Sequence, residues 1–246
     1  VGIILRNNTN IVDTLYIFSI PQDFKGLMRN SGPFWEPGRF TIYITLALAI
    51  NLFYFKEKIT SKKSLVLLLT NLTTFSTTGY VATAVLFVGY IFFSNIKKSY
   101  KFILSVILLV VVYYVGQLDF MTEKIAEQSA DDSTWSRFGA IAYHWNQITQ
   151  SPIIGFGPFL SNVFGDELFS PNGLTDLMRY YGIPLSIVFY YLLYRGTKVY
   201  VGNSHKGANV CLFVSLLLLC FSQTITYSPF FMILYFFAFN TYTYDK

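Results

Sequence analysis

Charged residues are scarce in this sequence: 13% of its 246 residues are Asp, Glu, Lys or Arg, whereas 53% are hydrophobic and the mean hydropathy is +0.46. This composition excludes an ordinary soluble globular domain. Several apolar runs are long enough, or nearly long enough, to cross the hydrocarbon core of a bilayer. We therefore predict an all-α, polytopic integral membrane protein.

Residues that build common catalytic and metal centres are also few. The two histidines and two cysteines form no zinc-type cluster, and no Gly-x-Ser-x-Gly motif of an acyl hydrolase is present in the sequence. Cys211 and Cys220 fall in one predicted helix about 13 Å apart, which is beyond the reach of a disulfide. The net charge of +5 accompanies no nucleic-acid motif. We predict no metal, no cofactor and no nucleic-acid partner.

The opening "VGIILRNNTNIVDTLYIFSI" lacks the basic flank, apolar centre and small-residue cleavage site of a secretory signal. We expect the chain to be the later part of a longer protein whose earlier spans are missing. Within the chain, apolar runs bounded by charge predict about seven transmembrane helices. The predicted spans are Thr41–Phe55, Ser64–Ser76, Thr78–Ser94, Phe102–Leu118, Leu174–Tyr194, Gly207–Thr226 and Pro229–Thr241.

The lysine-rich loops decide the topology. One long helix from Ser64 to Ser94 would place the lysines of 56–63 and of 97–101 on opposite sides of the membrane, whereas a tight hairpin through "TTFSTTGY" keeps them on one side. With the hairpin, the loops 56–63, 95–101 and 195–206 carry ten Lys or Arg and one acid, and the other face carries seven basic and eleven acidic residues. The positive-inside rule places the basic loops in the cytoplasm.

This topology divides the chain into four parts. Residues 1–39 form an extracytoplasmic segment with a re-entrant motif, and residues 40–118 form transmembrane helices. Residues 119–173 form one large extracytoplasmic loop, which is too long for a simple connector. Residues 174–246 form the remaining transmembrane helices.

The large loop contains one predicted helix. Asp132 or Ser133 can cap its start, and "SPIIGFGP" ends it because two prolines and two glycines in eight residues cannot continue a helix. Arg137 and His144 are two turns apart and lie on nearly one face. The apolar residues that recur at helical spacing are Phe138, Ile141, Ala142, Trp145 and Ile148.

The stretch "RNSGPFWEPGRF" places polar and helix-breaking residues directly before an apolar run. Glu36 precedes Pro37, which favours an extended backbone at Glu36. Gly32, Pro33 and Gly38 are expected to prevent a regular helix. Irregular backbone at the membrane edge is tolerated only where it is buried in protein or lines a wet cavity.

Charged residues at this edge must pair with one another or contact a substrate. Arg29, Glu36 and Arg39 allow both readings, a structural turn with an Arg–Glu pair and a binding site. The forked donors of Arg137 suit phosphate oxygens, although pairing with a nearby Asp would also explain this residue. His144 could accept a proton, but beside an aromatic residue we expect it to be packed and hydrogen-bonded, and we leave it out of the site.

Four motifs in order, "RNSGPFWEPGRF", "LTTFSTTGYVA", "STWSRFGAIAYHW…SPIIGFGP" and "PNGLTDLMRYYGIP", resemble the O-antigen polymerase and O-antigen ligase superfamily. The resemblance is closer to the polymerases of capsular and exopolysaccharide clusters, and it covers nearly the whole chain. It implies a metal-independent, all-helical glycosyltransferase at the outer face of the bacterial inner membrane, multi-pass, which uses glycans carried on undecaprenyl diphosphate. Membrane lipids, flippases and chain-length regulators are the further partners implied.

The resemblance also assigns residues. Arg137 matches the loop arginine before a Pro-x-x-Gly-x-Gly turn, and Asn172 matches the Asn that opens the next helix. Many ligases have Ser-Arg-Gly where this chain has Ser76 to Gly79, and His where it has Pro171. Both departures weigh against a ligase and leave the catalytic base unassigned by resemblance.

Joining sugars from a diphosphate-linked donor requires stabilisation of the leaving group and a proton acceptor for the attacking hydroxyl. We predict that Arg29, Arg39 and Arg137 surround the diphosphate and that Glu36 orients or deprotonates the acceptor. The further substrate-binding candidates are Asn172, Asp176 and Arg179.

The predicted function is a polysaccharide polymerase that joins lipid-linked repeat units. The alternatives are a ligase that transfers glycan to lipid A core, a transporter or flippase for lipid-linked sugars, and a non-catalytic scaffold. A transporter should show inverted repeats and charged residues at mid-membrane, and the centres of the predicted spans are almost free of charge.

Overall fold

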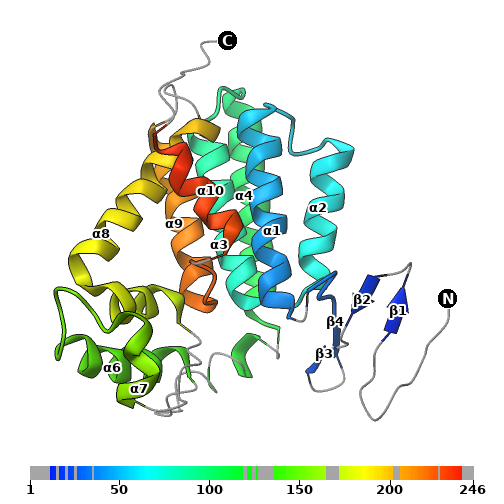
Figure 1. The fold of residues 1–246 in the computed structure, drawn as a ribbon. Helices are drawn as coiled ribbons and strands as arrows, with labels where there is room; N and C mark the ends of the chain where they lie inside the picture. The colour runs from blue at the N-terminus through cyan, green and yellow to red at the C-terminus, as the bar shows by residue number, and fades with distance from the viewer. Residues whose placement is uncertain are drawn as a thin grey trace. The chain divides into compact units, whose positions relative to one another are not determined.

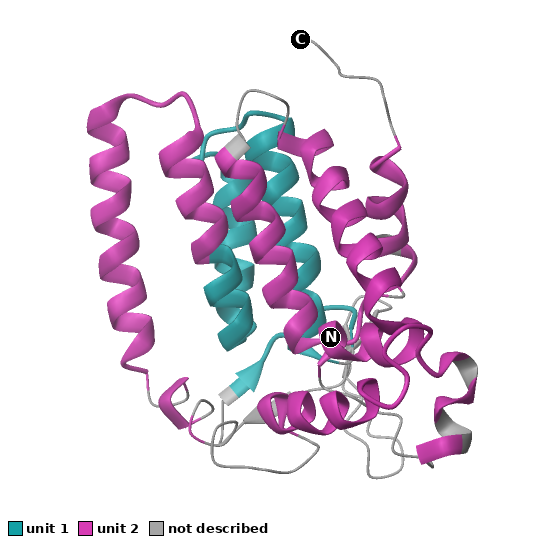
Figure 2. Cartoon of the chain, turned by 90° about the vertical axis from the view of Figure 1, so that its left-hand side faces the viewer, with its two compact units in different colours: residues 1–83 teal, residues 84–246 magenta. Residues whose placement is uncertain are grey.

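The structure is a computed structural model that describes residues 12–14, 17–19, 22–24, 27–34, 36–118, 121–123, 126, 136–164, 172–201, 206–226 and 228–239. The described residues fold mainly into helices (Figure 1), which confirms the predicted helical class. The chain divides into two compact units, residues 1–83 and 84–246 (Figure 2), and the boundary falls inside a helix.

Unit 1 contains two pairs of short strands that were not predicted. β1 (Val12–Thr14) pairs antiparallel with β2 (Ile17–Ser19), and β3 (Gln22–Phe24) pairs antiparallel with β4 (Leu27–Arg29). Strands of three residues carry too little alternation of polar and apolar residues to be recognised in a sequence. Arg29 is therefore the last residue of a strand.

Helix α1 (Pro37–Ala49) continues into a π-helical turn, η1 (Ile50–Tyr54). Glu36 has the predicted extended backbone, with φ −141° and ψ 133°. The expectation that Gly38 would prevent a helix is wrong, because α1 begins at Pro37 and includes Gly38. Proline at the first helical position has the correct φ and lacks only an N–H that would have no helical partner there.

Helices α2 (Lys62–Thr73) and α3 (Thr77–Phe93) are separated where the hairpin was predicted. Phe75 lies between them with φ +46°. Inside unit 1, Thr41 of α1 donates to the Asn71 side chain of α2, whose Nδ2 donates to Thr83 Oγ1 of α3 at 2.8 Å. These hydrogen bonds satisfy buried polar groups and hold the three helices in register.

Unit 2 contains the later helices. The α8 helix packs against α6, α9 and α10, and its buried side chains meet those of α9 and α10 to form the apolar core. The elements are α4 (Lys98–Gly116), α6 (Arg137–Ile148), the 3₁₀ turn η2 (Gly157–Phe159), α7 (Leu160–Phe164), α8 (Gly173–Val201), α9 (Lys206–Ser222) and α10 (Pro229–Phe237).

Helices lie at all seven segments that were predicted as spans. Within the described part of the chain, α4 is the one helix that is both long and apolar enough to cross a membrane, with a mean hydropathy of 1.9 over its most apolar stretch. α3 and residues 207–222 of α9 are apolar but shorter. The number of spans and the location of the large loop therefore stay predictions.

The predicted span Leu174–Tyr194 is not one continuous helix, because α8 is broken at Gly182, where φ is 75° and ψ is 170°. The break leaves backbone groups of α8 without helical hydrogen-bond partners, and the loop after α6 supplies those partners. Ile183 N donates to Pro152 O at 2.8 Å, and Arg179 O accepts from Phe156 N at 2.9 Å. The "SPIIGFGP" segment thus ends α6, as predicted, and also satisfies the backbone of α8.

Gly155 makes this docking possible. It has φ +71°, and a Cβ built on it would lie 2.6 Å from Gly182 N and 2.6 Å from Tyr180 O. Only glycine allows both this backbone conformation and so close an approach.

Candidate functional site

The predicted site residues fall into two clusters, one in each unit. The α1 cluster consists of Arg29, Glu36 and Arg39 in unit 1. The α6–α8 cluster consists of Arg137, Asn172, Asp176 and Arg179 in unit 2. Each cluster is built differently.

The turn next to Arg29 is held by hydrogen bonds of Asn30. Asn30 binds the end of α2 twice, with its N donating to Thr73 O at 3.0 Å and its Nδ2 donating to Thr73 Oγ1 at 2.9 Å. The Asn30 Oδ1 accepts from Gly32 N at 2.9 Å. Gly32 has φ +53°, and a Cβ there would meet the Phe40 ring at 2.7 Å. The irregular backbone predicted between Arg29 and α1 is therefore held in one conformation.

The three charged side chains of the α1 cluster are all half-buried. Burial lowers the pKa of Arg29 and of Arg39, and the negative charge of Glu36 raises both against that effect. The structure thus places Glu36 near enough to both arginines for its negative charge to act on each of them. Two guanidinium groups share one carboxylate, so the cluster carries one excess positive charge.

The α1 cluster also has unused hydrogen-bonding capacity. The Nε of Arg29 is buried and has no hydrogen-bond partner among the residues that the structure describes. The Glu36 side chain makes no cap at the start of α1. Its carboxylate is therefore not required to begin the helix.

In the α6–α8 cluster, Asn172 joins the starts of two helices. Its Oδ1 accepts from Leu174 N at 3.1 Å and from Thr175 N at 3.3 Å, which caps α8. Its Nδ2 donates to the carbonyl of Arg137, the first residue of α6, at 3.4 Å. With 1% of its surface exposed, Asn172 is an internal link between α6 and α8.

The cap of α6 differs from the prediction. α6 begins at Arg137, and Ser136 Oγ accepts from Gly139 N at 2.8 Å. The predicted caps, Asp132 and Ser133, lie outside the described residues. Serine is as good a cap as aspartate, so a run rich in both types leaves the first helical residue ambiguous.

Asp176 and Arg179 form a buried ion pair. The two residues are 2% and 1% exposed, and Arg179 Nε donates to Asp176 Oδ1 at 3.1 Å. Arg179 Nη1 donates to Gln147 Oε1 of α6 at 2.9 Å. Both residues are buried between α6 and α8, and their predicted contact with substrate stays a prediction.

Gln147, which accepts the hydrogen bond from Arg179, was not among the predicted site residues. It is 3% exposed and lies three residues after His144 on the face of α6 that also buries Ala140 and Ile148. Two polar residues at that spacing on an apolar face are a detectable signal for an internal hydrogen-bond network.

His144 is packed and hydrogen-bonded, as predicted. It is 2% exposed, and its Nδ1 lies 2.6 Å from Thr175 Oγ1. Burial lowers the pKa of His144 to about 3, and the positive charge of Arg179 adds to this shift. The imidazole is therefore neutral at physiological pH.

The two clusters have different chemical capacities. The α1 cluster can attract an anion with its guanidinium groups and accept a proton at its carboxylate. The α6–α8 cluster satisfies most of its own polar groups and holds the half-buried Arg137 at the start of α6. No group of three or more His, Cys, Asp or Glu side chains that could hold a metal occurs among the described residues.

Comparison with known proteins identifies one relationship. Residues 64–178 match the family described as O-antigen ligase. This segment runs from α2 to the first turns of α8 and includes Arg137, Asn172 and Asp176, while Arg179 lies one residue beyond it. Curated proteins and solved structures give no significant match to the chain.

Proposed function

We propose that the chain is a polysaccharide polymerase. The match of residues 64–178 to the family described as O-antigen ligase supports the predicted resemblance to the O-antigen polymerase and O-antigen ligase superfamily. Members of this family are membrane glycosyltransferase or ligase-type enzymes of surface-polysaccharide synthesis. In our proposal the chain works in the bacterial inner membrane, without a metal, and joins repeat units carried on undecaprenyl diphosphate at the outer face.

The observation that carries this proposal is the half-buried α1 cluster. Arg29 and Arg39 place two permanently charged guanidinium groups beside the single carboxylate of Glu36. Arginine stays charged at any relevant pH and can bind two phosphate oxygens at once, so it can hold a diphosphate without a metal. Partial burial strengthens such contacts because water screens them less.

The proposed reaction uses both functions of the cluster. The acceptor hydroxyl oxygen attacks the anomeric carbon of the donor sugar, and the bond between that carbon and the phosphate oxygen breaks. The lipid diphosphate leaves with the electron pair of the broken bond, and Arg29 and Arg39 stabilise its charge. The hydroxyl proton passes to the carboxylate of Glu36.

Arg137 stays in the proposal as a further ligand of the diphosphate, on the basis of the sequence resemblance. We propose that Asn172, Asp176 and Arg179 act as positioning residues for it. All three are at most 2% exposed, and Asn172 holds the backbone of Arg137. Their burial favours this supporting role over direct contact with a glycan.

A ligase that transfers finished chains onto lipid A core is the second candidate, because the matching family carries the ligase description. The polymerase is preferred because the chain has Ser76 to Gly79 and Pro171 where many ligases have Ser-Arg-Gly and His. A flippase and a chain-length regulator would be partners of a polymerase that makes long chains.

The proposal is tested by the chain-length ladder of surface polysaccharide in cells that carry Arg137→Lys or Glu36→Gln at matched protein abundance. We expect both variants to shorten or abolish the ladder, because lysine lacks the fork that binds two oxygens and glutamine cannot accept the proton. Arg195→Lys is the matched control, since Arg195 is an exposed arginine of α8. Normal ladders from both test variants would contradict the proposal.

A further inference from the structure

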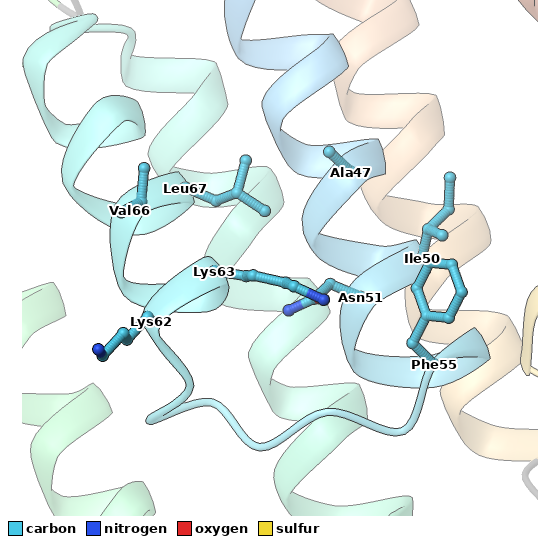
Figure 3. Close-up of a pocket in the computed structure, with 8 residues that line it drawn as sticks. All are labelled: Ala47, Ile50, Asn51, Phe55, Lys62, Lys63, Val66 and Leu67. Atoms are coloured by element: carbon cyan, nitrogen blue, oxygen red, sulfur yellow. The ribbon is translucent and has the colours of Figure 1, made fainter.

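Unit 1 contains a groove of about 610 Å³ between α1 and α2, at the opposite end of α1 from Glu36 (Figure 3). Its walls are almost wholly apolar. One side is formed by α1 and η1 and the other by α2. The lining residues are Ala47, Ile50, Asn51, Phe55, Lys62, Lys63, Val66 and Leu67.

The π-helical turn η1 shapes one wall of this groove. Phe55 N donates to Ile50 O at 3.0 Å, a bond that spans five residues and widens the helix. Phe55 stands on that wall with 64% of its surface exposed. The chain then turns away at Lys56, which has φ +54°. π-Turns of this kind are uncommon and occur frequently at functional sites.

Positive charge is concentrated at one end of the groove. Lys62 and Lys63 are the first residues of α2, and the loop 56–63 carries four lysines and one acid. Figure 3 shows the Lys63 side chain extending toward Asn51, whereas the side chain of Lys62, which also lines the groove, points away from α1. Lys63 Nζ lies 3.7 Å from Glu57, but both side chains are solvent-exposed, so this pair is weak.

We propose that this groove binds an anionic phospholipid, with an acyl chain along the apolar walls and the phosphate against Lys62 and Lys63. A soluble anion would gain nothing from walls such as Val66 and Leu67, and a neutral lipid would gain nothing from the two ammonium groups. The apolar walls therefore match the acyl chain of an anionic lipid, and the cationic residues at one end match its phosphate. This inference is independent of the proposed polymerase activity.

The test is native mass spectrometry of the purified full chain in detergent micelles, titrated with phosphatidylglycerol and with phosphatidylcholine of the same acyl chains. We expect phosphatidylglycerol to bind more tightly. Lys62→Gln/Lys63→Gln should weaken its binding about tenfold to thirtyfold, the effect of two lysines on an anionic lipid. Ala47→Trp should fill the groove and weaken binding with both lysines intact.

The matched control is Lys97→Gln/Lys98→Gln, a second pair of exposed lysines at a helix start. It should leave phosphatidylglycerol binding unchanged. Equal binding of the two lipids, unchanged binding in Lys62→Gln/Lys63→Gln, or an equal loss in the control pair would overturn the proposal. A dimer whose formation is abolished by Ala47→Trp, with no bound lipid, would overturn it in favour of a second copy of the chain.

Discussion

Arg29 of the α1 cluster and Arg179 of the α6–α8 cluster differ in how many hydrogen-bond partners the protein itself gives to their guanidinium groups. Arg179 is 1% exposed and has Asp176 and Gln147 as partners. Arg29 is half-buried, and its Nε finds no hydrogen-bond partner among the described residues. A buried charge with a partner at each nitrogen holds helices together, whereas a half-buried charge with an unused donor is ready for a ligand.

The largest effect should come from breaking the buried pair with Asp176→Asn. This change leaves the Arg179 guanidinium buried without its counter-charge, and we expect a loss of about 3–5 kcal/mol in the free energy of unfolding. The apparent Tm in detergent should fall by on the order of 10 °C. Asp176→Asn/Arg179→Gln should recover much of this loss because no charge is then buried. An unchanged Tm in Asp176→Asn would show that the pair does not hold the α6–α8 cluster.

The same carboxylate-to-amide change at Glu36 should act on activity instead. Glu36→Gln keeps the shape of the side chain and removes no helix cap, so the apparent Tm should stay within about 2 °C of wild type. The rate of glycan joining should fall by about 100-fold or more because the proton acceptor is gone. A Glu36→Gln protein that unfolds early would move Glu36 to a structural role and weaken the contrast between the clusters.

Glycine substitutions test whether the loop after α6 supports the broken helix α8. Gly155→Ala and Gly157→Ala share the strain of a positive φ, at +71° and +54°, but a Cβ at Gly157 meets nothing within 4 Å. Gly155→Ala should cost about 1–3 kcal/mol more than Gly157→Ala, because the atoms it meets belong to the backbone of α8. Equal Tm values for the two variants would show that the docking adds no stability.

The smallest effect is the pH dependence contributed by His144. Its pKa is lowered to about 3 from an ordinary value of 6.5, so between these values the unfolded chain carries the proton and the folded chain does not. Stability is therefore full above pH 6.5 and falls by about 1.4 kcal/mol per pH unit below it. His144→Asn should make the decline of Tm between pH 7 and pH 5 less steep. Parallel curves for the variant and wild type would contradict this assignment.

Much of the helical framework could be predicted because its signals are local. Apolar runs placed helices at all seven segments, the break between α2 and α3 falls in the predicted hairpin, and Glu36 is extended before Pro37 as its sequence requires. The start of α1 could not be placed correctly, because Gly38 reads as a helix breaker although it is tolerated in a first turn.

Features that depend on packing between distant segments could not be predicted. The break at Gly182 requires the loop around Gly155 to replace a helical hydrogen bond, and no pattern within α8 reveals that partner. The burial of Asp176 and Arg179 likewise depends on α6 lying against α8. Asp176 and Arg179 are three residues apart in the sequence, about one helical turn, but whether a charged pair is enclosed or exposed is decided by its neighbours.

The central claim is tested most directly by incubating the purified protein alone with purified repeat units carried on undecaprenyl diphosphate. The account predicts a ladder of products that contain two, three and more joined units, and no ladder from Glu36→Gln. Movement of intact lipid-linked units across a vesicle membrane without any joining, or transfer only to lipid A core, would contradict a polymerase.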